Sequence, residues 1–178
     1  VSCTTTINST FGNCLVVEGA GFLLNNEMDD FSAKPGVPNQ FGLVGGEANA
    51  IAPGKRMLSS MTPTIVMKDG KVRYVLGSPG GGRIINTVFQ VTSNLIDHGL
   101  SLPAAVAAPR IHHQWKPDSL TWERLALPAE VRSALSELGH SFARRPRTIG
   151  RCQAIEIRAD GERVGAADPR SGGAAMAY

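Results

Sequence analysis

Apolar residues recur at helical spacing in three stretches of the second half of the chain. In residues 83–98 they return every three or four positions, and Gly99 follows as a stop signal. A shorter stretch is expected to end before Pro109, and a third, in residues 127–138, is followed by Gly139. The pattern predicts three helices, and their inward-facing side chains are expected to be Ile84, Ile85, Val88, Val91, Leu95 and Ile96 in the first and Val131, Leu135 and Leu138 in the third.

Runs of β-branched and apolar residues flank two Asp-Gly pairs, Asp69-Gly70 and Asp160-Gly161. Asp-Gly between such runs is a strong signal of a β-hairpin with a two-residue turn. Residues 1–8 (VSCTTTIN) also predict a strand, and residues 14–26 predict two short strands joined by a Gly-rich turn. Strands, then helices, then strands, joined by hairpins rather than crossovers, predict an α+β sandwich.

The chain is expected to be one domain that is not self-sufficient. The strand predicted for residues 1–8 begins at the first residue with no cap or turn before it, so a lost or cleaved neighbour is expected. Residues 34–56 carry Pro and Gly throughout and show no periodicity. They predict a long ordered loop, and loops of this length often carry function as lids.

The composition is that of an ordinary soluble globular protein, with 42% hydrophobic and 19% charged residues among 178. No run approaches the roughly 18 apolar residues of a membrane helix, so no membrane span is expected. The net charge of +3 includes one basic cluster, residues 142–151. A nucleic-acid patch and a solvated edge near a partner chain are the alternatives, and the lack of interleaved aromatic residues favours the second.

Neither the cysteines nor the histidines predict a metal site, and no cofactor is expected. Cys3, Cys14 and Cys152 lack metal-ligand spacing, and buried free thiols are favoured over a Cys3–Cys14 bridge. His112 and His113 are neighbours on a predicted strand, so their side chains point to opposite faces and cannot readily share a metal. Structural packing beside Trp115 is the favoured interpretation of this pair.

The segment LLNNEMDDFSAKPG, residues 23–36, places three carboxylates within four positions: Glu27, Asp29 and Asp30. Like charges this close repel one another unless a cation lies among them or they point into water. The segment does not fit the alternating ligand pattern of an EF-hand calcium loop. A bound ammonium group suits two inward carboxylates with the third facing outward, and a solvated acidic turn is the alternative.

Two other segments could bind anions. In GSPGGGRII, residues 77–85, consecutive glycines precede a helix N-terminus, as in phosphate cradles and oxyanion holes, although a tight strand-to-helix turn also explains them. Ser59 and Ser60 could donate to a carboxylate or could be plain turn residues. An anion cradle, a hydroxyl pair and a carboxylate cluster together suit a small amino-acid-like acyl donor.

Seven motifs in register resemble the small subunit of γ-glutamyltranspeptidases: NSTFG, LLNNEMDDFSAKPGVPN, GLVGG, SSMTPTIV, GSPGG, APRIHHQW and DPRSGGAAMAY. The resemblance covers nearly the whole chain. It implies an N-terminal nucleophile hydrolase with a four-layer αββα sandwich. In this family one precursor cleaves itself into a large and a small subunit, and the large subunit completes the sandwich. Residues 1–178 would be the small subunit without its N-terminal strand and nucleophilic threonine.

The resemblance implies γ-glutamyl transfer and hydrolysis on glutathione and other γ-glutamyl amides, with an amino acid, a peptide or water as acceptor. A periplasmic or secreted bacterial location, no nucleic-acid partner and no metal are also implied. Thr6 would hydrogen-bond the nucleophile, and Gly80 and Gly81 would form the oxyanion hole. The substrate-binding residues would be Asn8 at the donor's α-substituents, Glu27 and Asp30 at its α-ammonium, and Ser59 and Ser60 at its α-carboxylate.

One departure and two alternatives remain. Phe41 stands where many bacterial members have a tyrosine that bridges to the asparagine over the pocket, so a looser lid is expected. A related branch removes glutaryl groups from cephalosporins, but glutaryl has no α-ammonium, so Glu27 and Asp30 favour a glutamyl donor. A catalytically inert γ-glutamyl-binding remnant is the other alternative.

Overall fold

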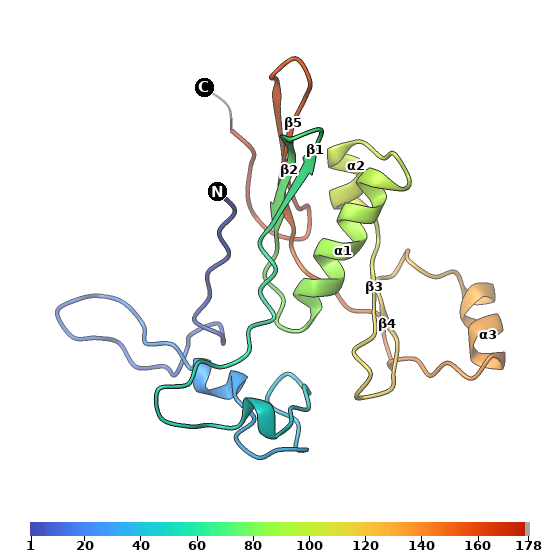
Figure 1. Cartoon of the computed structure of the whole chain (residues 1–178). Helices are drawn as coiled ribbons and strands as arrows, with labels where there is room; N and C mark the ends of the chain where they lie inside the picture. The colour runs from blue at the N-terminus through green and yellow to red at the C-terminus, as the bar shows by residue number, and fades with distance from the viewer. Residues whose placement is uncertain (177–178) are drawn as a thin grey trace. The chain divides into compact units, whose positions relative to one another are not determined.

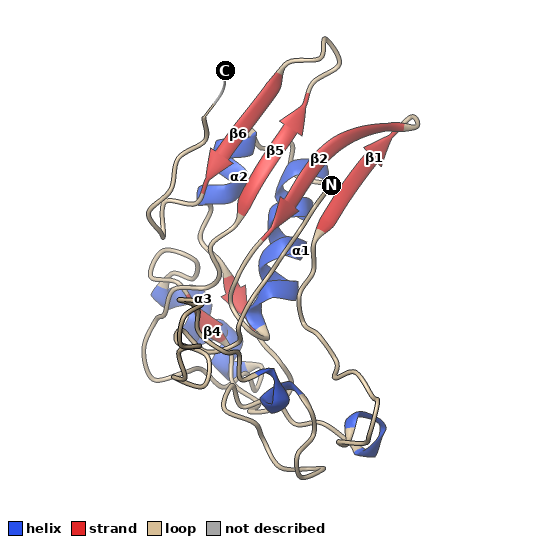
Figure 2. Ribbon diagram, turned by 90° about the vertical axis from the view of Figure 1, so that its left-hand side faces the viewer, coloured by secondary structure: helices blue, strands red, loops and turns tan. Residues whose placement is uncertain are grey.

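The computed structural model describes residues 1–176 in two compact units, residues 5–60 and residues 1–4 with 61–176. The larger unit is built on an antiparallel sheet with the strand order β1-β2-β5-β6 (Figures 1 and 2). Its strands are β1 (Thr64–Lys68), β2 (Lys71–Gly77), β5 (Gln153–Ile157) and β6 (Arg163–Ala167).

Both predicted hairpins are confirmed. Asp69 and Gly70 both have positive φ angles, 50° and 74°, as a two-residue turn matched to the twist of the strands requires. At the second hairpin, the Arg158 N–H donates to the Glu162 carbonyl across the Asp160-Gly161 turn. β5 then pairs with β2 as well, which joins the two hairpins into one sheet.

The other predicted strands are wrong. Residues 1–8 form no strand, because they make no backbone ladder with a partner; near their start only the Ser2 hydroxyl donates, to the Leu76 carbonyl. Residues 14–26 turn back on themselves with backbone hydrogen bonds from Val17 to Phe22 and from Leu24 to Leu15. These bonds leave a single isolated bridge rather than two strands.

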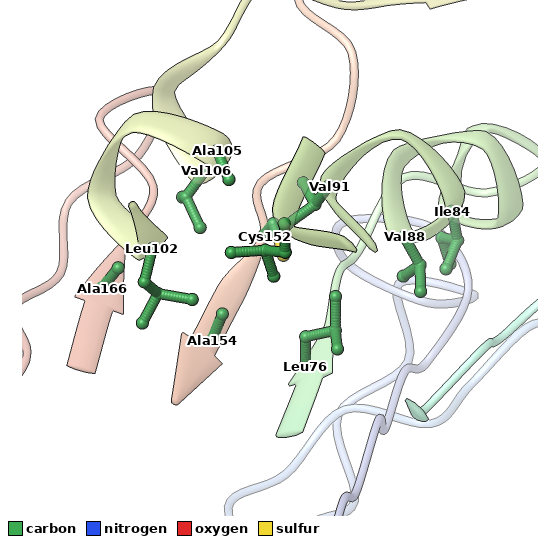
Figure 3. Close-up of a cluster of buried hydrophobic side chains, with 11 residues drawn as sticks. Leu76, Ile84, Val88, Val91, Leu102, Ala105, Val106, Cys152, Ala154 and Ala166 are labelled. Atoms are coloured by element: carbon green, nitrogen blue, oxygen red, sulfur yellow. The ribbon is translucent and has the colours of Figure 1, made fainter. Parts of the chain in front are cut away.

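Two helices, α1 (Arg83–Ile96) and α2 (Leu102–Ala107), pack on one face of the sheet (Figure 2). The core between them contains residues from both layers, including Leu76, Val91 and Cys152 (Figure 3). Cys152 is fully buried, and this burial raises the pKa of its thiol to about 11. Four of the six residues of α1 that were predicted to face inward are buried: Ile84, Val88, Val91 and Leu95. The prediction is wrong for Ile85 and Ile96, which are each about half exposed.

The third predicted helix forms as α3 (Ala129–Glu137), but the prediction that its apolar side chains are buried is wrong. None of its residues is buried, and Leu138 beyond its end is 78% exposed. A short ribbon of β3 (Ile111–His112) and β4 (Thr121–Trp122) lies between α2 and α3 in the sequence. Among the described residues, the apolar stripe of α3 is therefore covered only in part: Val131 and Leu138 are exposed and Leu135 is partly buried.

The opposite face of the sheet is also apolar. Ile65, Val75 and Ile155 are paired in register across β1, β2 and β5, and Ile65 and Ile155 are each nearly half exposed. One sheet with helices on one face agrees with the predicted α+β class. The chain thus contains a helical layer and a sheet layer, while the four-layer sandwich stays an expectation.

Residues 5–60 contain two 3₁₀ helices, η1 (Glu27–Asp30) and η2 (Glu47–Asn49), and otherwise irregular backbone. Asparagine side chains hold this backbone in place. The Asn39 carboxamide oxygen accepts from the N–H groups of Phe41 and Leu43, and its Nδ2 donates to the Asp29 carbonyl. The expected long ordered loop is therefore confirmed. Within residues 1–176, no helix is long and apolar enough to cross a bilayer.

Candidate active site

The predicted site residues fall into both units. Residues 5–60 contain Thr6, Asn8, Glu27, Asp30, Ser59 and Ser60, whereas Gly80 and Gly81 belong to the larger unit.

Glu27 and Asp30 are brought together by the single turn of η1. Their carboxyl groups share a hydrogen bond, and the pKa of each is raised, chiefly because burial penalises the charged form. The shared hydrogen bond further raises the pKa of Glu27 and partly offsets the rise in the pKa of Asp30. No basic side chain contributes to either shift, so this pair favours an incoming cation.

Unsatisfied hydrogen-bonding capacity strengthens this interpretation. The Oε1 atom of Glu27 is inaccessible and has no hydrogen-bond partner among residues 1–176. A buried carboxylate oxygen without a partner is costly, and a cation that donates hydrogen bonds would remove the cost. The Oδ2 atom of Asp29 is likewise inaccessible and without a partner among residues 1–176, but its Oδ1 accepts from the Gln40 N–H at 3.3 Å and so helps to hold the following loop.

Asp30 and Ser60 line the same hollow, which has a volume of about 260 Å³. The acidic and hydroxyl segments, separate in the sequence, are therefore neighbours within residues 5–60. Asn49 lies in the wall of this hollow as well, between the two segments. A ligand in the hollow could contact a carboxylate and a hydroxyl group at once.

Thr6 and Asn8 are connected to the acidic segment through Asn26, which immediately precedes η1. The Thr6 Oγ1 accepts from the Asn8 N–H at 2.8 Å, and the Asn8 Nδ2 donates to the Asn26 carbonyl at 3.1 Å. Asn8 has a φ of 73°, a conformation that asparagine tolerates better than most residues. These bonds hold the Asn8 side chain in one orientation beside the segment that carries Glu27.

Gly80 and Gly81 form the turn that opens α1. Their φ angles are 147° and 57°, and their carbonyls accept from the N–H groups of Arg83 and Ile84. Neither glycine N–H donates to an acceptor within residues 1–176. Positive φ angles and free N–H groups at a helix N-terminus are suited to binding a developing negative charge.

The histidine pair is separated as expected. The Nε2 of His112 contacts Gln114 and that of His113 contacts Asp118. Burial lowers the pKa of His112, so it is neutral at physiological pH. No group of three His, Cys, Asp or Glu residues that could hold a metal ion occurs in residues 1–176.

Sequence reasoning missed a buried ionic network in the larger unit. Arg110, almost fully buried, donates to the Asp168 carboxylate at 2.8 Å, and Arg170 bridges Asp168 to Glu123. Burial alone would raise the pKa values of Asp168 and Glu123, but their hydrogen bonds and the arginines lower both. The two arginines belong to the motifs APR and DPR, but nothing in the sequence signals that they share a carboxylate partner.

Comparisons with known proteins identify the family of this chain. A family model described as Gamma-glutamyltranspeptidase matches residues 1–178. The Glutathione hydrolase proenzyme of Escherichia coli (strain K12) is 54% identical over 171 residues, which are 96% of this chain and 29% of that relative. The chain thus spans about a third of the length of such a relative.

Two further proteins are also similar to this chain. The Acylase ACY 1 proenzyme of Pseudomonas sp. (strain SE83) is 40% identical over 177 residues, 99% of this chain and 29% of that relative. A solved structure of a gamma-glutamyltranspeptidase from Pseudomonas nitroreducens complexed with L-DON superposes with a TM-score of 0.93 at 50% identity, covering 100% of this chain and 93% of that chain. Since the family model spans every residue and the fold agrees throughout, the chain belongs to the gamma-glutamyltranspeptidase family.

Proposed function

We propose that this chain is the small-subunit part of an enzyme that transfers and hydrolyses γ-glutamyl groups of glutathione and other γ-glutamyl amides. The observation that carries the proposal is the Glu27–Asp30 pair, which has raised pKa values, a partnerless buried oxygen and no basic neighbour that shifts it. The α-ammonium of a γ-glutamyl donor supplies the missing positive charge. Ser59 and Ser60 bind the donor's α-carboxylate, and Asn8 contacts its α-substituents.

The proposed reaction proceeds through a γ-glutamyl-enzyme. An N-terminal threonine, which is not among residues 1–178, attacks the γ-carbonyl with its own α-amine as base, and Thr6 positions it. The backbone N–H groups of Gly80 and Gly81 donate to the oxyanion that forms. The amine leaving group departs, and water or an acceptor amine then releases the glutamyl group. No metal or cofactor is required.

A large subunit from the same precursor covers the apolar sheet face that carries Ile65 and Ile155, supplies the second sheet, and adds an arginine at the donor's carboxylate. The protein is exported, to the periplasm or the medium.

The test is an assay of the assembled protein, processed from its precursor. Release of p-nitroaniline from γ-glutamyl-p-nitroanilide is expected, and glycylglycine as acceptor should increase the rate of release. Glutamate binding without any release of p-nitroaniline would instead identify an inert binding protein.

A second candidate, an acylase acting on glutaryl amides, is favoured by the 40% identity to Acylase ACY 1 proenzyme. A glutaryl substrate lacks the α-ammonium, so it offers the Glu27–Asp30 pair no cation to bind. The p-nitroanilides of glutamate and glutarate decide between the two. The glutamyl compound should have a kcat/KM at least about tenfold higher, since a charged hydrogen bond contributes about 1.5–3 kcal/mol.

The raised pKa values of Glu27 and Asp30 predict a pH-dependent KM for the donor. The pair binds an ammonium best when both carboxyls are ionised, and a raised pKa means that protonation starts at a higher pH than for ordinary carboxyls. KM should therefore rise as the pH falls, before ordinary carboxyls titrate. Donor KM measured from about pH 8 down to about pH 5 checks this, and a KM unchanged over that range would contradict it.

A further inference from the structure

Asn49 connects the two segments that the proposed function assigns to the two charges of the donor. Its Nδ2 donates to the Asp30 carbonyl at 2.8 Å, and its Oδ1 accepts from the Leu58 N–H at 2.9 Å. Leu58 immediately precedes Ser59 and Ser60. One carboxamide therefore links the backbone of the acidic turn to the backbone of the serine segment.

The Asn49 backbone is fixed independently of its side chain. Its carbonyl accepts from the Ser32 N–H at 2.9 Å, and its N–H donates to the Gly46 carbonyl at 3.1 Å. The Lys55 ammonium donates to the carbonyls of Ala48 and Ala50 on either side of it. These contacts persist when only the Asn49 side chain is changed, so the 3₁₀ turn η2 should remain.

We infer that Asn49 is a positioning residue that sets the spacing between the Glu27–Asp30 pair and the Ser59–Ser60 pair, and so makes the site selective for donors carrying both an α-ammonium and an α-carboxylate. The inference rests on the proposed function. Asn49 lies in the wall of the hollow, and the hydrogen bonds of its side chain go to backbone atoms of the two segments, so replacing it removes chiefly the link between them. What it removes is the fixed distance between the two pairs.

A fixed distance affects only ligands that use both ends of the site. L-Glutamate has both α-substituents, glutarate is the same molecule without the α-ammonium, and 4-aminobutanoate is glutamate without the α-carboxylate. A ligand held at one end tolerates a shift of the other end, whereas glutamate does not. The three compounds therefore separate lost spacing from general damage to the site.

The experiment measures the Kd of each compound by calorimetry on the assembled protein, so the result does not depend on turnover. In Asn49→Ala the Kd of L-glutamate should rise about tenfold, which corresponds to about 1.4 kcal/mol. The Kd values of glutarate and 4-aminobutanoate should change less than about twofold. Asn49→Asp keeps the acceptor for Leu58 and loses the donor to Asp30, so it should show the same selective loss.

The matched control is Asn13→Ala, which removes an asparagine whose Oδ1 accepts one loop hydrogen bond, from the Leu15 N–H at 2.9 Å. It should leave all three Kd values unchanged. Equal weakening of all three compounds in Asn49→Ala, or no weakening of glutamate, would overturn the inference. Absence of p-nitroaniline release by the wild-type protein would overturn the proposed function instead, so the two failures are distinguishable.

Discussion

Replacing Asp168 by alanine is expected to lower the free energy of unfolding by about 3–5 kcal/mol, because removing one partner of a buried ion pair leaves the other charge uncompensated. Asp168 accepts from the Arg110 guanidinium at 2.8 Å and from the Cys152 N–H at 2.6 Å. Both donors would lose this acceptor in a region closed to water. Denaturant unfolding of the assembled protein measures the loss, which is a large fraction of a typical total stability.

Two comparisons make this result specific. Asp118→Ala removes an exposed carboxylate that contacts His113, and it should change stability by less than about 1 kcal/mol. Replacing Arg110 by methionine together with Asp168 by leucine removes both buried charges and should be less damaging than Asp168→Ala alone. A cost of Asp168→Ala no greater than that of Asp118→Ala would show that the network carries little of the stability.

Replacing Asp30 by asparagine is expected to raise the KM for a γ-glutamyl donor by about 10- to 100-fold, the range that loss of one charged hydrogen bond supports. The change conserves shape and removes one charge from the pair that meets the α-ammonium. The kcat should change much less, since the reacting carbonyl lies at the other end of the donor. Steady-state kinetics on the assembled protein separates the two constants.

Asp29→Asn is the matched control, because it neutralises the adjacent carboxylate in the same turn. Its Oδ1 accepts from the Gln40 N–H, and an amide oxygen retains that bond. The KM should therefore change by less than about threefold. An equal rise in KM for both variants would assign the effect to the overall charge of the segment rather than to Asp30.

Local sequence signals predicted the features that depend on short-range geometry. Asp-Gly located both hairpin turns, because glycine readily adopts the positive φ angle found at Gly70 and Gly161, and helical spacing located α1 and its buried residues. The close spacing of Glu27 and Asp30 predicted a carboxylate pair. The structure agrees, because one 3₁₀ turn suffices to bring the two side chains together.

Features that depend on distant partners were not predictable in this way. The periodicity of α3 identified its apolar stripe but could not say whether anything covers it. Arg110 and Asp168 are separated by 58 positions, and each alone looks like an ordinary surface charge. Asn49 likewise resembles any loop asparagine until its two backbone partners are known.

Because Cys152 lies in the core, the rate at which its thiol is modified reports how often the core opens. Thiol reagents attack the thiolate, and a fully buried thiol with a pKa of about 11 offers almost none at neutral pH. Cys3 and Cys14 are exposed, so they are expected to react without any opening of the core. Modification of the Cys152 thiol should therefore be slow, and intact mass can follow it. Its rate measures how often the layer of α1 and α2 separates from the sheet, and no probe has to be introduced.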